Sequence, residues 1–175
     1  MSARAGRALL LLPLGLASAA LGPPPAAADR GESTLSVDVS FASFAISDQD
    51  GLGGALGVDY ERGLSDAFWL RAAAGGAYYR RDEGGAYAGS GAVGLTYVVD
   101  VVKYVPYLSV GLGAVFLDGA AIDGELHPTV EIGIGLDFLT RRGLSYGAFA
   151  RFGSFLEDSS FFTAGLRMTW RWGLF

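Results

Sequence analysis

The sequence of 175 residues contains no cysteine. Disulfide bonds and a lipid anchor on an N-terminal cysteine are therefore excluded, and the fold must depend on packing and hydrogen bonds alone. Long apolar runs are also missing after the N-terminal region, because no segment there supplies the roughly 20 apolar residues of a membrane-spanning helix. Yet 51% of the residues are hydrophobic. Such a chain is either a soluble protein with a large core or a β-barrel in a membrane.

Positive charge is scarce, with 13 Lys and Arg against 18 Asp and Glu, which argues against nucleic acid as a partner. No metal-ligand cluster and no glycine-rich phosphate loop in a strand–helix context can be recognised, so we expect no cofactor. The single histidine, His127, has no serine beside it in its segment. Because hydrolytic or acyl-transfer chemistry needs a nucleophile next to such a base, we expect that the protein is not an enzyme.

The first 28 residues have the pattern of a secretory signal peptide. Arg4 and Arg7 precede an apolar stretch, and three alanines, Ala26 to Ala28, precede the expected cleavage point. The stretch is too short and too interrupted by glycine and proline to span a membrane. We therefore expect a signal peptide over residues 1–28 and one domain over residues 29–175. Without Arg4 and Arg7 the mature chain carries 11 basic and 18 acidic residues, a net charge of −7.

Glycine is abundant, at 27 of 175 residues, which disfavours helices and suits strongly curved sheets. Large apolar residues alternate with other residues with a period of two, which is typical of β-strands. The predicted strands cover Leu35–Ile46, Leu52–Arg62, Phe68–Arg80, Ala86–Val99, Leu108–Phe116, Thr129–Phe138, Leu144–Gly153 and a last one running to the end of the chain. The acidic stretch Asp118–Glu125 and the stretch Phe155–Ser160 are predicted as loops.

The two faces of these strands differ in side-chain size. In the fifth segment, Leu108, Val110 and Leu112 alternate with Ser109 and Gly111. A soluble barrel such as a lipocalin places its bulky apolar side chains inside. Here the small face suits a narrow lumen and the bulky face suits lipid. Because no sheet edge can stay unpaired in lipid, the sequence predicts an all-β fold, a closed antiparallel eight-stranded transmembrane β-barrel.

The small face also carries charges, which we expect to form a network in the lumen. A hairpin centred on Ser65 would place Asp59 directly across from Arg71, and one centred on Arg141 would place Glu131 across from Arg151. Closure would bring Arg167 and Arg171 near Asp38. Such a network is either a plug of salt bridges or a polar path through the barrel. Its predicted members are Asp38, Asp59, Glu61, Arg71, Glu131, Asp137, Arg151, Arg167 and Arg171.

Aromatic residues near the strand ends indicate the two interfacial girdles of a membrane barrel. On the side expected to face the periplasm these are Tyr60, Phe68, Tyr97, Tyr146, Trp170 and Trp172. On the opposite side they are Phe41, Tyr78, Phe116, Phe152 and Phe162.

The chain resembles the small eight-stranded outer-membrane barrels of the OmpA/OmpX type, the outer-membrane β-barrel domain family. The resemblance is carried by the terminal strand, which ends on Phe175 like an assembly signal, and by the stretch Pro106-Tyr107 followed by Gly111-Leu-Gly113. One feature departs from the family. Phe175 is out of step with the face that holds Trp170 and Trp172, and a bulge near Gly173 would restore the register.

The resemblance implies export to the periplasm, insertion into the bacterial outer membrane by the barrel-assembly machinery, and both chain ends in the periplasm. Outer-membrane lipid and lipopolysaccharide are then the expected partners, and a monomer is the expected state. The four loops outside would be acidic, which suggests either a divalent-cation site that bridges to lipopolysaccharide phosphates or simply solvated turns.

We expect a non-enzymatic integral outer-membrane protein with a structural, envelope-integrity or surface-interaction role. A narrow or gated pore for small solutes is the first alternative, and a soluble periplasmic lipid binder is another. A lipid A-modifying enzyme is a further alternative. Lipid A deacylases of this size show His-x-Ser-Asn, however, whereas this chain has His127-Pro-Thr-Val130.

Overall fold

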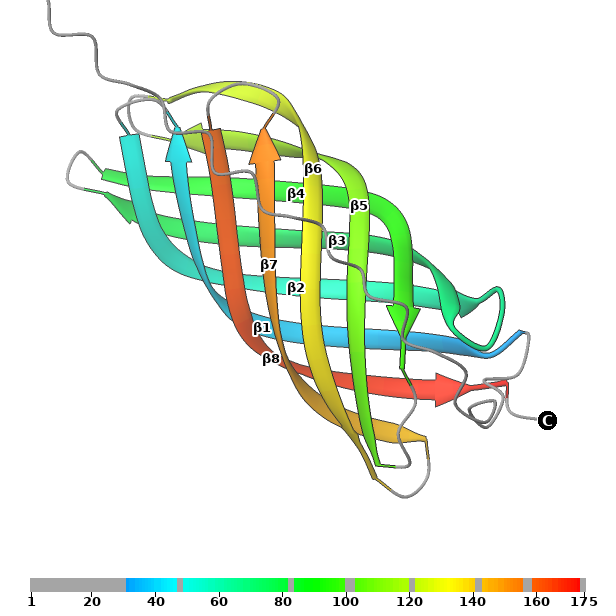
Figure 1. Cartoon of the computed structure of the whole chain (residues 1–175). Helices are drawn as coiled ribbons and strands as arrows, with labels where there is room; N and C mark the ends of the chain where they lie inside the picture. Colours follow the sequence, from blue (N-terminus) through cyan, green and yellow to red (C-terminus); the bar gives the residue numbers. More distant parts are fainter. Residues whose placement is uncertain are drawn as a thin grey trace, which may run out of the picture.

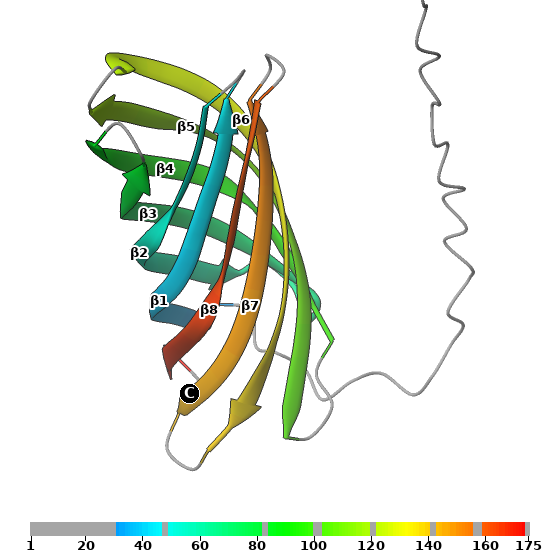
Figure 2. The ribbon, with the colours of Figure 1, turned by 90° about the vertical axis from the view of Figure 1, so that its left-hand side faces the viewer.

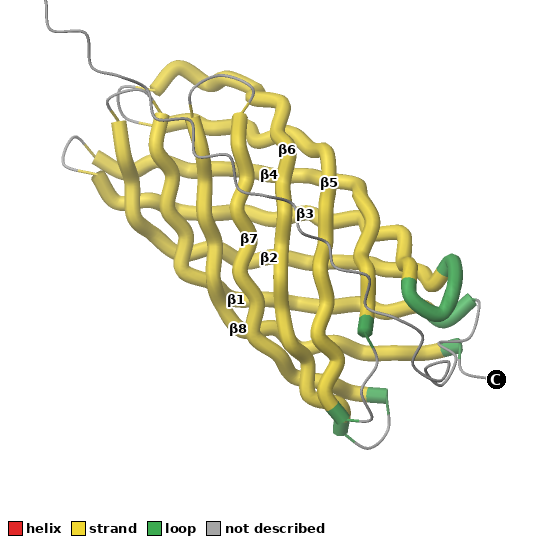
Figure 3. The backbone as a smooth tube through the Cα atoms, in the orientation of Figure 1, coloured by secondary structure: helices red, strands yellow, loops and turns green. Residues whose placement is uncertain are grey.

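The computed structural model describes residues 31–46, 49–81, 84–99, 103–119, 122–140, 143–155 and 159–173. Strands make up nearly all of these residues, with short turns between them (Figure 3). Within these ranges, no helix is long and apolar enough to cross a membrane. The predicted signal peptide and Phe175 lie outside the described residues, so both stay predictions.

Each strand pairs antiparallel with the next, and the last pairs with the first, so that the sheet closes into a barrel. Figures 1 and 2 show β1 and β8 side by side in both views. The prediction of a closed eight-stranded barrel is therefore confirmed. The strands are β1 (Ser33–Ile46), β2 (Gln49–Gly63), β3 (Phe68–Arg81), β4 (Gly84–Val98), β5 (Tyr104–Gly119), β6 (Ile122–Leu139), β7 (Leu144–Phe155) and β8 (Ser159–Trp172).

Most strands are longer than the sequence predicted, and two predicted loops are partly wrong. Within Asp118–Glu125, β5 continues to Gly119 and β6 begins at Ile122. Phe155 and Ser159 likewise belong to β7 and β8. Acidic and glycine residues suggested loops there, but the antiparallel ladder continues past them, with Leu117 still paired to Glu125. Backbone pairing with the neighbouring strand outweighs the weak local preference of such residues.

The two ends of the barrel differ. The connections β2–β3, β4–β5 and β6–β7 lie at the end where the described chain begins and stops, which we call the terminus end (Figure 1). The other four connections lie at the opposite end, which we call the loop end. β8 stops at Trp172, and Gly173 follows with a φ of +98°, outside the extended region. The strand thus ends at the glycine where the sequence suggested a bulge.

The outer surface of the barrel is apolar, and its side chains are large. Leu112, Ile134 and Leu166 are 64%, 60% and 65% exposed. The lumen side of the same strands carries mainly glycine, alanine, serine, threonine and charged residues, and most of these are buried or half-buried. The predicted assignment of bulky side chains to the outside of the barrel is therefore confirmed.

Glycines provide the space for large side chains inside this narrow lumen. Gly135 on β6 lies opposite Tyr107 on β5, and a Cβ atom at Gly135 would collide with the tyrosine ring. Gly147 on β7 lies opposite Asp137 on β6, and a Cβ atom there would collide with the Asp137 carboxylate and the backbone of β6. The abundance of glycine thus follows from close approach between neighbouring strands.

We expect Gly147→Ala to lower the free energy of unfolding by about 1–3 kcal/mol, because the added methyl group overpacks a site bounded by backbone. Gly89→Ala is the matched control, since a Cβ atom at Gly89 on β4 meets no atom within 4 Å. Urea unfolding in detergent measures the free energy of unfolding of both purified variants. Equal effects of the two substitutions would contradict the close-approach explanation.

Candidate functional site: the charged lumen

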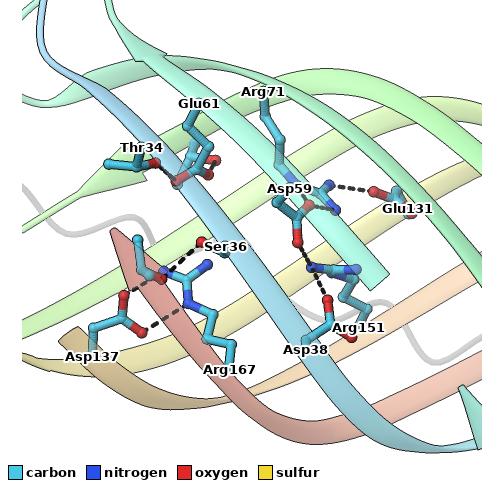
Figure 4. A network of polar contacts seen from close by, with 12 residues as sticks. Thr34, Ser36, Asp38, Asp59, Glu61, Arg71, Glu131, Asp137, Arg151 and Arg167 are labelled. Atoms are coloured by element: carbon cyan, nitrogen blue, oxygen red, sulfur yellow. Dashed lines mark hydrogen bonds and ion pairs between the residues drawn. The ribbon is translucent and has the colours of Figure 1, made fainter. Parts of the chain in front are cut away.

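The largest group of charges in the lumen centres on Asp59 of β2 (Figure 4). Asp59 is fully buried and accepts a hydrogen bond of 2.7 Å from Nε of Arg71 on β3, and another from Nη2 of Arg151 on β7. Arg71 also pairs with Glu131 on β6 through Nη1, and Nη2 of Arg151 lies 3.8 Å from Oδ2 of Asp38 on β1. We call these five residues the Asp59 network. It connects five strands across the lumen.

A second ion pair lies closer to the terminus end. Arg167 of β8 donates two parallel hydrogen bonds to Asp137 of β6, at 2.8 Å from Nε and 2.7 Å from Nη2. The guanidinium carbon of Arg167 also lies 3.9 Å from the ring centroid of Tyr107 on β5. A bidentate guanidinium–carboxylate pair stacked on an aromatic ring satisfies both the charge and the geometry of arginine.

The remaining predicted charges have other surroundings. Glu61 is buried and accepts a hydrogen bond of 2.6 Å from the hydroxyl of Thr96, with a longer one of 3.5 Å from Thr34. The guanidinium carbon of Arg171 lies 6.0 Å from the ring centroid of Trp69. All nine residues predicted for the lumen network thus face the lumen, in two ion-paired groups and two further positions.

Two of the predicted facing positions were wrong, although the predicted ion pair of Asp59 with Arg71 does form. Arg71 lies directly across from Glu61, not Asp59, and Arg151 lies across from Gly133, not Glu131. The cause is the length of the turns. Backbone hydrogen bonds of 2.9 Å join Leu64 N to Phe68 O and Thr140 N to Leu144 O, which centres each hairpin one residue later than predicted.

The expected contacts at the β1–β8 seam are also partly wrong. Asp38 does lie opposite Arg167, but Arg171 lies opposite Thr34. The ion pair of Arg167 instead reaches over Gly147 of β7 to Asp137 of β6, because both residues lie opposite this glycine and it has no side chain. The seam itself carries a hydrogen bond of 2.7 Å between the buried hydroxyls of Ser36 and Thr169.

Bulky apolar side chains also fill part of the lumen, which the sequence analysis did not identify. Near the loop end, a buried cluster surrounds Phe44 and Tyr79, whose rings meet edge to face with 4.7 Å between centroids. Near the terminus end, Trp69 is only 1% exposed. Extending the period-two alternation to the strand ends would have found them, since Phe44 has the parity of Asp38, and Tyr79 and Trp69 have that of Arg71. The other members of the loop-end cluster are Ala42, Ala86, Val115 and Leu117.

A cavity of about 70 Å³ remains between the Asp59 network and the loop-end cluster. It is lined by Asp38, Arg151 and Glu131 on one side and by Phe44 and Tyr79 on the other. A cavity of this size, with polar groups on part of its wall, has room for more than one water molecule.

The six aromatics predicted for the terminus-end girdle all point outward and are exposed. Several form aromatic pairs. Phe68 and Tyr97 lie on the neighbouring strands β3 and β4, with 5.3 Å between centroids, and Tyr60 of β2 meets Trp172 of β8 across β1, at 6.4 Å. Tyr104 and Phe138 form a further outward pair, at 5.6 Å, which the sequence analysis did not include.

Among the described residues, no three His, Asp or Glu side chains gather closely enough to hold a metal ion. The acidic loop end is only partly described, because Asp48, Asp82, Glu83, Glu157 and Asp158 lie outside the described residues. A divalent-cation site there stays a prediction.

No family model and no curated protein matches the chain. Solved structures, in contrast, do match the chain. Neisserial surface protein A is 14% identical, with a TM-score of 0.66, and the match covers 80% of this chain and 98% of that one. Ail, the attachment invasion locus protein of Yersinia pestis, is 15% identical, with a TM-score of 0.58 and coverage of 82% and 100%. The chain has the fold of the small eight-stranded outer-membrane β-barrels.

The outer membrane enzyme PagL has the same fold. It is 24% identical, with a TM-score of 0.53, and the match covers 75% of this chain and 97% of that one. Barrels of this architecture therefore include an enzyme as well as surface proteins, and the shared fold does not by itself distinguish between these roles.

We expect Arg167→Met to lower the free energy of unfolding by about 3–5 kcal/mol, because it leaves Asp137 charged and unpaired in the lumen. The double variant Arg167→Met, Asp137→Leu should lose much less than either single substitution, since no uncompensated charge remains. Urea unfolding of the four proteins of this double-mutant cycle measures the coupling energy. Additive effects would show that the pair is not coupled.

Proposed function

We propose that this protein is an integral protein of the bacterial outer membrane, without enzymatic activity, whose closed barrel has a structural, envelope-integrity or surface-interaction role. The observation that carries the proposal is the combination of a predominantly apolar outer surface with a lumen filled by ion pairs and aromatic rings. A filled lumen leaves the outer surface and the loops as the parts that meet other molecules.

The outer surface supports a location in lipid. Large apolar side chains cover all eight strands, and rows of exposed aromatics lie at both ends of this apolar belt. A soluble lipid binder would present the opposite arrangement, with apolar residues around an interior ligand cavity and charges outside. Here the charges lie inside, so the periplasmic lipid binder is not favoured.

The filling of the lumen supports a closed barrel rather than a pore. Three layers follow one another along the lumen. Trp69 and Tyr107 occupy the terminus end, the Asp59 network the middle, and the cluster of Phe44 and Tyr79 the loop end. A solute would have to displace buried rings as well as paired charges. An eight-stranded barrel is only wide enough for its own side chains to fill it.

The enzyme alternative comes from the likeness to PagL. Such catalysis needs a histidine beside a nucleophile. The single histidine of the sequence, His127, lies on β6 and is followed by Pro128, Thr129 and Val130. The His-x-Ser-Asn pattern expected of a lipid A deacylase is not present. We therefore propose that the barrel does not modify lipid A.

Substitution on the outer surface tests the location in lipid. We expect Leu112→Arg, at the middle of β5, to lower stability in lipid bilayers by about 2–4 kcal/mol, because it places a charge at the centre of the membrane. Leu64→Arg is the control, since Leu64 is 50% exposed in a turn at the terminus end. Reversible unfolding from liposomes measures the free energy of unfolding of both variants. Equal, small effects would indicate that the belt faces water.

Planar-bilayer recordings test whether the lumen is closed. We expect no steady current from the purified protein. Phe44→Ala combined with Tyr79→Ala should still give none, because the Asp59 network remains. Adding Arg71→Ala and Glu131→Ala in the middle layer, together with Trp69→Ala and Tyr107→Ala at the terminus end, should open a measurable conductance, since all three layers are then removed. A steady current from the unaltered protein would support the narrow pore instead.

A further inference from the structure

A row of four residues across neighbouring strands creates the cavity in the lumen. Asp38 of β1 lies opposite Gly57 of β2, Gly57 opposite Gly75 of β3, and Gly75 opposite Ser90 of β4. Because the two glycines have no side chains, the Asp38 carboxylate can lie over Gly57 and the Ser90 hydroxyl over Gly75, and both polar groups reach into the lumen. Ser90 is exposed although it faces the lumen, and both residues line the cavity.

The charges beside this cavity do not balance. The Asp59 network contains three carboxylates, of Asp38, Asp59 and Glu131, but only two guanidinium groups, of Arg71 and Arg151. The network therefore carries one excess negative charge. A buried charge without compensation is strongly unfavourable, so a compensating positive group is expected in or beside the network.

Asp38 is the carboxylate with the weakest pairing. Asp59 and Glu131 accept close hydrogen bonds from the arginines, whereas Oδ2 of Asp38 is 3.8 Å from Arg151 and has no hydrogen bond within the described part of the chain. The Asp38 side chain is only 3% exposed. An acceptor this deeply buried is normally satisfied by a donor, a water molecule or a cation.

The cavity has room for such a cation, and oxygen atoms form part of its wall beside the paired guanidinium groups of Arg71 and Arg151. Its volume is about 70 Å³, and besides Asp38 it is lined by the hydroxyl-bearing residues Ser40, Ser90 and Thr129. Hydroxyl and carboxylate oxygens together with water suit hard cations. One excess charge matches a monovalent ion, whereas a divalent ion would leave the site positive.

We propose that the lumen holds a monovalent alkali cation, such as sodium or potassium, bound in the hydrated cavity beside Oδ2 of Asp38. The ion balances the charge of the Asp59 network. It is enclosed between the ion pairs and the apolar cluster of the loop end when the barrel folds. This inference depends on the lumen alone and not on the physiological role proposed above.

Stability in different salts tests the proposal. The purified barrel is folded and then unfolded by urea in detergent at pH 8, in the chloride of sodium, potassium or N-methylglucamine at equal ionic strength. A ligand that binds only the folded state raises stability. The urea midpoint should therefore be higher in sodium or potassium than in N-methylglucamine, which is too large for the cavity. Equal midpoints in all three salts would overturn the proposal.

Two variants test whether the difference between the salts arises at Asp38. Asp38→Asn keeps the shape of the side chain but removes the excess charge, so its midpoint should no longer differ between the salts. Ser36→Ala is the matched control on the same strand, because Ser36 also faces the lumen but is bound to Thr169 and does not line the cavity. It should lower the midpoint in every salt and keep the difference. A salt effect that survives Asp38→Asn would overturn the assignment to Asp38.

Crystals of the unaltered protein grown in thallium(I) give a direct test that needs no variant. An anomalous peak within coordination distance of Asp38 Oδ2 is the expected result. If no peak appears there, Asp38 is neutralised by a proton instead, and the proposal is overturned.

Discussion

The pairing of β1 with β8 is the interaction on which the rest of the structure depends. A strand edge in hydrocarbon would leave backbone N–H and C=O groups without partners, and each such group is strongly unfavourable in lipid. Closing the sheet after eight strands removes both edges, and it also limits the circumference. The lumen is therefore narrow, and every residue that points into it must fit against side chains from the opposite wall.

The narrow lumen explains how small and large residues are distributed inside. Tyr107 and Asp137 each face a glycine on the neighbouring strand, Gly135 and Gly147. A cavity remains where two glycines, Gly57 of β2 and Gly75 of β3, lie opposite each other and no large side chain occupies the space. The interior is thus neither a uniform plug nor an open channel.

The charges add connections that the sheet cannot provide. Backbone hydrogen bonds join only neighbouring strands, whereas Asp59 of β2 binds Arg151 of β7, and Arg71 of β3 binds Glu131 of β6. These pairs link opposite walls of the barrel and oppose its flattening. Because paired charges must still be desolvated, the presence of these ion pairs is weak evidence for high stability.

Much of this architecture was accessible from the residues themselves. The alternation of bulky and small side chains correctly predicted eight strands, their outward faces and the nine lumen charges. It predicted the ion pair of Asp59 with Arg71 but not the partners of Arg151 and Arg167, because a shift of one residue in the turns near Ser65 and Arg141 moves every facing pair by two positions. It also missed Phe44, Trp69 and Tyr79, because the alternation was not followed to the strand ends.

The sequence by itself determined the class of fold and the direction of each side chain, since a period of two is a local property of an extended chain. The tertiary structure alone decided the register of the hairpins, the partners of Arg151 and Arg167, the contact of Arg71 with Glu131, and the position of the cavity beside Asp38. Those features depend on turn length and on contacts across the lumen. Both arise only when the sheet closes and distant strands face one another.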